Sequence, residues 1–397
     1  MERCVLVSSG KDPYILITNR RSWERCLKEL QEAPRIAVDL EANGLYAYRE
    51  KICLIQISTD RNHFIVDPLA GFSLEGLKPI FADESVEKVF HAVDYDLTLL
   101  QGLYRWKVRG LFDTMRAAEI LGHTSIGLAS LLGSFYGLTL SKKYQKANWG
   151  LRPLSREHLL YAYNDTCHLL RLRDDLATHL VRENLMEEAR EAFEQVCHMP
   201  PAMRVFDPDH FWKIPGALHL DDPLPAVLKA LFIFRESEAQ KQDVPSFKIM
   251  SNKMLAGIIQ QVGTWHKTGV RELVPDACIP LKLLERYRAV LMKTIQAALL
   301  HPPPPRISCQ STHTNGFWQR LEKLKEWRKN EADGQGVQSN VVLTRAAMTE
   351  IAERNPGTLQ ALSMLKLLGP VCCRKYGPDI LEVLRSASEE APSNKQT

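Results

Sequence analysis

The chain has 397 residues, of which 45% are hydrophobic and 25% charged, a composition typical of a folded protein with two or three domains. Collagen, low-complexity disorder and disulfide scaffolds are excluded. No run of about 18 apolar residues predicts a transmembrane helix, and the N-terminus lacks the pattern of a secretory signal. The nine cysteines form no C-x-x-C pair. Together these features predict a cytoplasmic protein with reduced thiols and no membrane partner.

The net charge of +4 is unevenly distributed along the chain. Residues 1–220 carry 27 basic and 29 acidic side chains, whereas 221–300 and 316–385 each carry 11 basic and 8 acidic ones. An acidic first part suits carboxylates that bind cations, and a basic excess in the later parts suits a polyanionic partner.

Strand and helix patterns alternate over the first 200 residues. We predict strands at 35–39, 51–58, 63–67 and 88–92, and helices at 22–30, from 95, and at 113–121, 126–136 and 155–195. The turn residues 60–62 make the second and third strands an antiparallel hairpin. Residues 1–196 are therefore predicted to form an α/β domain, a mixed sheet flanked by helices.

Beyond residue 196 the strand patterns fade. The predicted order is a connector at 197–222, a helical domain at 223–300, a proline-rich linker at 301–315, a second helical domain at 316–385 and a polar tail at 386–397. In each helical domain an arginine follows a leucine by seven residues, Leu228 with Arg235 and Leu321 with Arg328. This pattern indicates a repeated small all-α domain.

Five residues are candidates for a metal-binding catalytic site. Asp39 and Glu41 end an apolar strand, where residues two apart point to the same face. A buried acid there needs a partner such as a metal ion; a solvated strand end is the alternative. Asp96 follows the strand at 88–92, and Tyr161 and Asp165 lie four apart, on one face of a predicted helix.

Four carboxylates can hold two divalent cations about 4 Å apart, an arrangement that hydrolyses phosphodiesters. Oxygen ligands without a Cys/His set favour Mg²⁺ or Mn²⁺ over Zn²⁺. The hydroxyl of Tyr161, one turn from Asp165, is placed to orient the attacking water.

Five segments, in order, resemble the ribonuclease D family, DEDD-type 3′–5′ exonucleases with a tyrosine in the third motif. The segments are Ala37–Glu41, Ile52–Ser58, His91–Asp96, Leu111–Ala118 and Arg152–Asp165. The segments 223–300 and 316–385 resemble the HRDC domain that RecQ-type helicases share with this family. The resemblance implies an RNase H-like exonuclease domain followed by two HRDC-like domains. It also implies hydrolysis that releases nucleoside 5′-monophosphates from a 3′ end.

The resemblance also assigns roles by position. Asp39, Glu41 and Asp165 would bind the metal that carries the nucleophile, and Asp39 would bridge to a second metal. Asp96 would support that second metal, and Tyr161 would position the nucleophilic water. The chain departs from the family at position 42, where Ala42 stands for an aromatic residue that packs on the terminal base. Tyr46 or Tyr48 could replace that residue; partly buried strand aromatics are the alternative.

Six further side chains are candidate contacts to RNA: His91, Lys142, Lys143, Lys146, Trp149 and Arg152. Basic residues interleaved with an aromatic ring suit single-stranded nucleic acid. For His91 the alternative is a hydrogen-bonded histidine behind the site. For Trp149 the alternative is a ring packed on the core.

We therefore expect a metal-dependent 3′–5′ exoribonuclease that trims the single-stranded 3′ tails of tRNA precursors and other small structured RNAs. A 3′–5′ DNA exonuclease is the first alternative, because discrimination between RNA and DNA rests on 2′-hydroxyl contacts. A non-catalytic RNA-binding protein is the second. Protein partners are not predicted.

Overall fold

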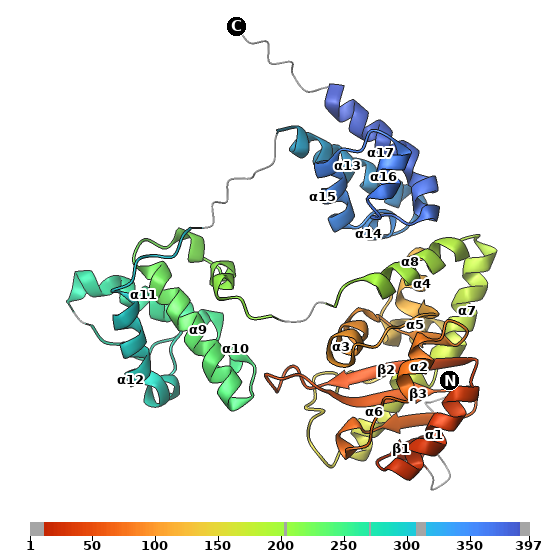
Figure 1. Cartoon of the computed structure of the whole chain (residues 1–397), viewed down its shortest axis with the longest axis horizontal. Helices are drawn as coiled ribbons and strands as arrows, with labels where there is room; N and C mark the ends of the chain where they lie inside the picture. The colour runs from red at the N-terminus through yellow and green to blue at the C-terminus, as the bar shows by residue number, and fades with distance from the viewer. Residues whose placement is uncertain (1–11, 202–204, 270, 307–314, 390–397) are drawn as a thin grey trace. The chain divides into compact units, whose positions relative to one another are not determined.

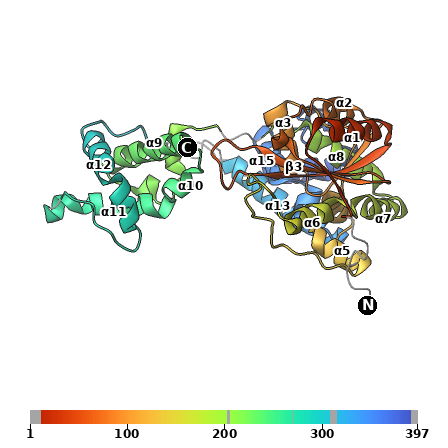
Figure 2. The same cartoon turned by 90° about the horizontal axis from the view of Figure 1, so that it is seen from below.

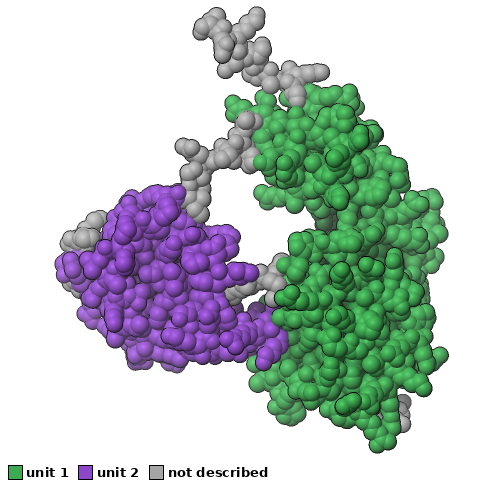
Figure 3. Space-filling view, viewed as in Figure 1, with its two compact units in different colours: residues 1–41, 52–202, 311–397 green, residues 42–51, 203–310 purple. Residues whose placement is uncertain are grey.

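The computed structural model describes residues 12–201, 205–269, 271–306 and 315–389. Most of the predicted linker, the end of the predicted tail and the start of the N-terminus lie outside these residues. The chain forms two compact units (Figure 3): one contains residues 1–41, 52–202 and 311–397, the other 42–51 and 203–310. Within the described residues, no helix has the length and apolarity needed to cross a membrane, and the cysteines are free thiols.

The first unit contains a six-stranded sheet with the order β1-β4-β3-β2-β5-β6. The strands are β1 (Ile15–Ile17), β2 (Arg35–Ala42), β3 (Ile52–Ser58), β4 (His63–Val66), β5 (Glu87–Phe90) and β6 (Leu111–Asp113). β3 and β4 pair antiparallel, whereas β1 with β4, β2 with β5, and β5 with β6 pair parallel. The predicted hairpin and the mixed sheet are confirmed. β1 and β6 were not predicted, because three residues are too few to show an alternating pattern.

Eight α-helices accompany this sheet within residues 12–201. They are α1 (Arg20–Glu32), α2 (Leu77–Ala82), α3 (Asp94–Tyr104), α4 (Thr114–Ile120), α5 (Leu128–Tyr136), α6 (Arg156–Thr166), α7 (Leu169–Arg182) and α8 (Met186–His198); a short 3₁₀ turn covers Pro68–Ala70. Figure 2 shows α1, α2 and α3 on one side of the sheet and α5 and α6 on the other. All seven residues of β3 are buried, as expected for a strand covered on both faces.

The helix predicted at 155–195 is three helices. α6 ends at Thr166 and α7 at Arg182, and Asn184 between α7 and α8 has a positive φ of 56°. A left-handed residue ends a helix, and asparagine tolerates this conformation better than most residues. The breaks allow α6 to pack against β3 and β4 while α7 and α8 pack against β5 and β6.

The second unit is a helical bundle (Figure 1) of α9 (Leu224–Gln242), α10 (Ser246–Ile249), α11 (Asn252–Thr268) and α12 (Leu281–Ala298), with 3₁₀ turns at Pro208–Lys213 and Ala217–His219. The segment that we expected to be a connector contributes to its core, because Phe211 and Trp212 are buried against α9. Residues 42–51, which begin at the last residue of β2 directly after Glu41, also belong to this unit.

The first unit carries a second bundle of α13 (Asn315–Gln335), α14 (Ser339–Val342), α15 (Arg345–Arg354), α16 (Leu359–Met364) and α17 (Pro370–Glu389). The repeated arginines have the same place in both bundles. Arg235 donates to the carbonyl of Met250 at 3.2 Å, and Arg328 donates to that of Leu343 at 3.1 Å. Each acceptor lies 15 residues after its arginine and follows the last residue of a short helix, α10 or α14. The repeat read from the sequence is therefore a repeat in structure.

Glu191 of α8 joins this second bundle to the sheet domain within the first unit. Its carboxylate is buried and accepts hydrogen bonds from the backbone N–H groups of Val371 at 2.6 Å and Cys372 at 3.0 Å, at the start of α17. A carboxylate at a helix N-terminus satisfies free N–H groups and complements the helix dipole.

We expect Glu191→Gln to lower the free energy of unfolding of the first unit by about 1–2 kcal/mol, because one charge-assisted acceptor becomes an amide donor. Glu194→Gln, on the same helix but exposed, is the matched control and should change little. Thermal unfolding of both variants measures the difference. Equal midpoints for the two variants would contradict this account of the contact.

Candidate active site

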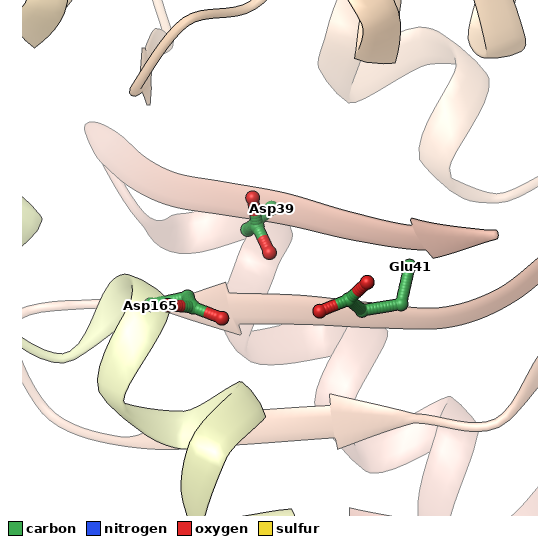
Figure 4. A group of neighbouring side chains, drawn as sticks. All are labelled: Asp39, Glu41 and Asp165. Atoms are coloured by element: carbon green, nitrogen blue, oxygen red, sulfur yellow. The ribbon is translucent and has the colours of Figure 1, made fainter. Parts of the chain in front are cut away.

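Three of the four predicted carboxylates lie together. Asp39 and Glu41 project from the same face of β2, and Asp165 reaches them from α6 (Figure 4). One carboxylate oxygen of each residue lies within 4.8 Å of the others. The i, i+2 spacing in a strand and the packing of α6 on the sheet produce this geometry.

The position of α6 is fixed at both of its ends. At the start, the hydroxyl of Ser155 accepts a hydrogen bond from the backbone N–H of His158, the usual role of a serine N-cap. At the end, Ser58 of β3 donates to the hydroxyl of Thr166 at 2.8 Å. Thr166 follows Asp165 directly, so this buried bond holds the carboxylate against the sheet.

Asp96 lies in the first turn of α3, which follows β5, and is 6% exposed. It is outside the group of three whose oxygens meet within 4.8 Å. Its charge nevertheless contributes to raising the pKa of Glu41. Asp96 therefore faces the same site from a separate element.

Burial is the largest cause of a raised pKa at all four carboxyl groups. It raises the pKa of Asp39 to about 7, and the charges of Asp39, Asp165 and Asp96 further raise that of Glu41. No cation among the described residues lowers any of these pKa values. An all-oxygen donor set with uncompensated negative charge fits a hard divalent cation.

Tyr161 lies one turn before Asp165 on α6. Burial raises its pKa, and so do the charges of Asp165, Glu41 and Asp39, so the phenol stays protonated at neutral pH. Its ring packs at 5.9 Å from Trp149 and 6.2 Å from Tyr144. The surrounding rings fix the direction of a neutral hydroxyl next to the carboxylates.

Asp113 positions the turn that carries Asp96. Its fully buried carboxylate accepts hydrogen bonds from the N–H groups of Ala92 at 3.1 Å and Val93 at 3.0 Å, and from Met115 at 2.8 Å in α4. Ala92 has a positive φ of 62°, a strained conformation for a residue with a Cβ. The two hydrogen bonds from the turn offset that strain, so Asp113 is both the N-cap of α4 and a support of the site.

We expect Asp113→Asn to reduce the free energy of unfolding by about 2 kcal/mol, because the new amide group meets buried N–H donors. The turn before Asp96 should also loosen, so the midpoint increase that Mg²⁺ produces in thermal unfolding should shrink. Asp94→Asn is the control, because Asp94 is exposed and pairs with Arg116 at 2.8 Å. A full Mg²⁺ response in Asp113→Asn would contradict the positioning role.

The structure decides between the two alternatives for His91. His91 shares a hydrogen bond of 2.9 Å between its Nδ1 and the hydroxyl of Thr114, and that hydroxyl donates to Phe90 O. Because the hydroxyl proton is already used, Nδ1 of His91 is the donor. His91 is therefore hydrogen-bonded behind the site. Asp94, the first residue of α3, makes no capping bond and pairs with Arg116.

Two of the six candidate RNA contacts, Trp149 and Arg152, use their ring faces or polar groups for contacts within the protein. Trp149 is 1% exposed and packs with Cys53 and Leu54 of the sheet, which leaves no ring face for a base. Arg152 donates from Nε and Nη2 to Asp67 at 2.7 Å each, and its other N–H groups meet backbone carbonyls. Both residues hold the 138–153 loop against the sheet.

The remaining loop cations and the two tyrosines differ in their surroundings. Lys142, Lys143 and Lys146 are exposed. Tyr48 is not in a strand: its hydroxyl donates to Glu236 at 2.7 Å, within the second unit. The ring of Tyr46 lies 4.0 Å from the ammonium of Lys248, also in that unit. Sequence reasoning missed these contacts because they join residues 188 and 202 positions apart in the chain.

Comparison with known proteins identifies the parts of the chain. A family model described as 3′–5′ exonuclease matches residues 14–181, and the HRDC domain model matches residues 225–262 and 318–384. The chain is 34% identical over 268 residues to exosome complex exonuclease RRP6 of Saccharomyces cerevisiae, covering 63% of this chain and 36% of that protein. It is 30% identical over 249 residues to ribonuclease D of Gluconacetobacter diazotrophicus, covering 62% and 63%.

Solved structures agree with this assignment. RNase D of Escherichia coli superposes with a TM-score of 0.68 over 96% of this chain and 99% of that one, at 20% identity, and shows the shared fold. The catalytic core of RRP6 from Trypanosoma brucei has a TM-score of 0.64 and 26% identity, over 75% of this chain and 82% of that one. The predicted RNase H-like domain and helical domains are confirmed. Residues 14–181 thus match the 3′–5′ exonuclease domain, and residues 225–262 and 318–384 match the HRDC domain. The chain is similar to ribonuclease D and to RRP6, and it spans between about a third and two thirds of the length of these curated relatives.

Proposed function

We propose that this protein is a 3′–5′ exoribonuclease that uses two divalent cations, Mg²⁺ or Mn²⁺, to release nucleoside 5′-monophosphates from RNA. The observation that carries the proposal is the group of Asp39, Glu41 and Asp165, whose oxygens meet within 4.8 Å and which no cation among the described residues neutralises. Matches to the ribonuclease D and RRP6 relatives support it.

Each side chain of the site has a part in the proposed reaction. Asp39, Glu41 and Asp165 bind the cations, and Asp96 adds a carboxylate from α3. When bound, two such cations activate a water molecule and stabilise the leaving oxygen. The neutral hydroxyl of Tyr161 orients the attacking water in line with the terminal phosphodiester.

The proposed substrates are tRNA precursors and other small structured RNAs with single-stranded 3′ tails. The exposed side chains of Lys142, Lys143 and Lys146 lie on the loop that precedes α6, and we propose that they contact the phosphates of the tail. The basic excess of the helical segments 221–300 and 316–385 supports a role in binding the body of the RNA.

The test identifies the released product and the end attacked. RNA with a 3′-hydroxyl, the same RNA with a 3′-phosphate block, and the matching DNA are incubated with Mg²⁺, and the products are separated by chromatography. We expect nucleoside 5′-monophosphates from the unblocked RNA and far fewer from the blocked RNA or the DNA. Faster release from DNA would favour the DNA exonuclease. Tight binding without release would favour the non-catalytic protein.

A further inference from the structure

A second feature of the first unit lies away from the catalytic carboxylates. A groove of about 1150 Å³ runs beside the edge strand β6 and is bordered by the segment 105–110, the starts of β5 and β6, and α8. β5 and β6 are parallel. Their first residues line the groove, whereas Asp96 and Asp113 follow or occupy their last positions. The groove is therefore at the opposite end of these strands from the active site.

The segment before β6 presents a row of cations to this groove. Arg105, Lys107 and Arg109 are exposed and line it, while Trp106 and Val108 between them are 1% and 3% exposed. Arg105 is the left-handed residue that ends α3. Lys107 and Arg109 follow it, and each pair of neighbouring cations is separated by one buried residue, so the three charges lie on the exposed side of the segment.

The charge of the row is not neutralised by the protein. Within the described residues, Arg105, Lys107, Arg109 and also Arg190 of α8 make no side-chain hydrogen bond or ion pair. Arg173, in contrast, binds Glu87 through two contacts of 2.7 Å.

Two further carboxylates face the four free cations. They are Glu84 and Glu194, and the second lies 3.7 Å from His198. A net positive charge therefore remains in the groove.

Apolar side chains at the base of the groove strengthen the electric field of these cations. Phe112 and Phe193 line it with ring centroids 4.9 Å apart, and both are 3% exposed. An apolar wall lowers the local dielectric constant and focuses the field of nearby charges. A groove of this kind favours a polyanion over a neutral ligand.

We propose that this groove binds the phosphodiester backbone of the RNA substrate, upstream of the 3′ end that enters the active site. The inference rests on the proposed function, because that function makes the polyanion an RNA. RNA is favoured over an acidic peptide because the exonuclease domain itself carries the groove. Contacts of this type set affinity and orientation without reading sequence.

The test uses the full chain and a triple variant, Arg105→Gln/Lys107→Gln/Arg109→Gln. Binding of a labelled RNA hairpin with a single-stranded 3′ tail is measured in EDTA, between about 50 and 200 mM salt. We expect the affinity to fall at least about tenfold at low salt, and the slope of log K against log salt to become shallower by about 3, one for each lost phosphate contact.

The matched control removes the same charge from another part of the same unit. Arg21, Arg25 and Lys28 are exposed on α1, and Arg21→Gln/Arg25→Gln/Lys28→Gln should keep the wild-type affinity and slope. Equal losses in both triple variants would overturn the inference, because they would show an effect of net charge alone.

Two other results would also overturn it. One is wild-type RNA affinity in the groove variant. The other is loss of binding to a poly-glutamate peptide while RNA binding persists, which would assign the groove to an acidic protein. These outcomes are separate from failure of the proposed function, in which the wild-type chain neither binds RNA in EDTA nor shortens it with Mg²⁺.

Discussion

Asp39→Asn is expected to reduce RNA hydrolysis by at least about 10³-fold, because cation binding at such a site contributes several kcal/mol of transition-state stabilisation. Asp39 and Glu41 share one face of β2, and Asp165 meets them within 4.8 Å. Removing the charge of Asp39 takes one ligand from the centre of this group. Single-turnover cleavage of 5′-labelled RNA with Mg²⁺ measures the loss. Glu75→Gln, an exposed carboxylate elsewhere in the same unit, is the control and should cleave at the wild-type rate.

The same substitution should stabilise the protein when no metal is present. Burial raises the pKa of Asp39 to about 7, above its value in the unfolded chain. A carboxyl group whose pKa is raised by folding destabilises the fold as pH increases through that range. The unfolding midpoint of the wild-type chain in EDTA should therefore rise as pH falls from about 8 to about 6, and Asp39→Asn should flatten this rise.

Addition of Mg²⁺ distinguishes the role of Asp39 in metal binding from its effect on the stability of the metal-free protein. Mg²⁺ should raise the unfolding midpoint of the wild-type chain, because it binds the folded state alone, and should raise that of Asp39→Asn much less. A variant that keeps both hydrolysis and the full Mg²⁺ response would remove Asp39 from the site.

Tyr161→Phe is expected to slow hydrolysis by about 10²-fold, a size typical of a lost positioning or proton-transfer group. The raised pKa of Tyr161 keeps its phenol protonated, so the wild-type hydroxyl is a neutral hydrogen-bonding group at neutral pH. Phenylalanine retains the ring that packs near Trp149 and Tyr144. The affinity for RNA in EDTA and the Mg²⁺ response of the unfolding midpoint should therefore stay unchanged.

Tyr163→Phe is the matched control for this prediction. Tyr163 is two residues further along α6, and its ring packs against His63 at 5.0 Å and Tyr14 at 6.3 Å. Its substitution should leave the rate of hydrolysis unchanged. If Tyr161→Phe cleaved RNA as fast as this control does, the hydroxyl of Tyr161 would have no part in the reaction.

The sequence predicted those parts of the fold that depend on local pattern. The hairpin of β3 and β4 follows from two β-rich runs around a turn, and the common face of Asp39 and Glu41 follows from strand geometry. The placement of Tyr161 and Asp165 one turn apart follows from the helix period. Their approach to β2 is a tertiary contact, and it was inferred through the family resemblance.

Other features depend on contacts that sequence patterns do not contain. Arg152 and Trp149 have the residue types of an RNA-binding loop, yet a buried partner, Asp67, and the core of the sheet occupy them. Only the folded structure reveals such partners. Phe211 and Trp212 were likewise assigned to a connector, because the prolines around them hide how deeply the two rings are buried.

In the two helical bundles, by contrast, the sequence pattern correctly indicated a repeat in the structure. Arg235 and Arg328 stood out in sequence as matching positions, and each donates to a backbone carbonyl 15 residues later. An arginine that satisfies the end of a short helix constrains both the spacing and the residue type. That constraint is why a duplicated domain is recognisable here although its apolar residues differ.

The most direct measurement of the central claim is a cleavage time course on 5′-labelled hairpins with single-stranded 3′ tails. RNA and DNA versions are compared with Mg²⁺, Mn²⁺ or EDTA, using the wild-type chain and Asp39→Ala. A metal-dependent ladder that shortens from the 3′ end, faster on RNA and absent in the variant, is the predicted result. A ladder that persists in EDTA or in Asp39→Ala would contradict the assignment of the reaction to these carboxylates.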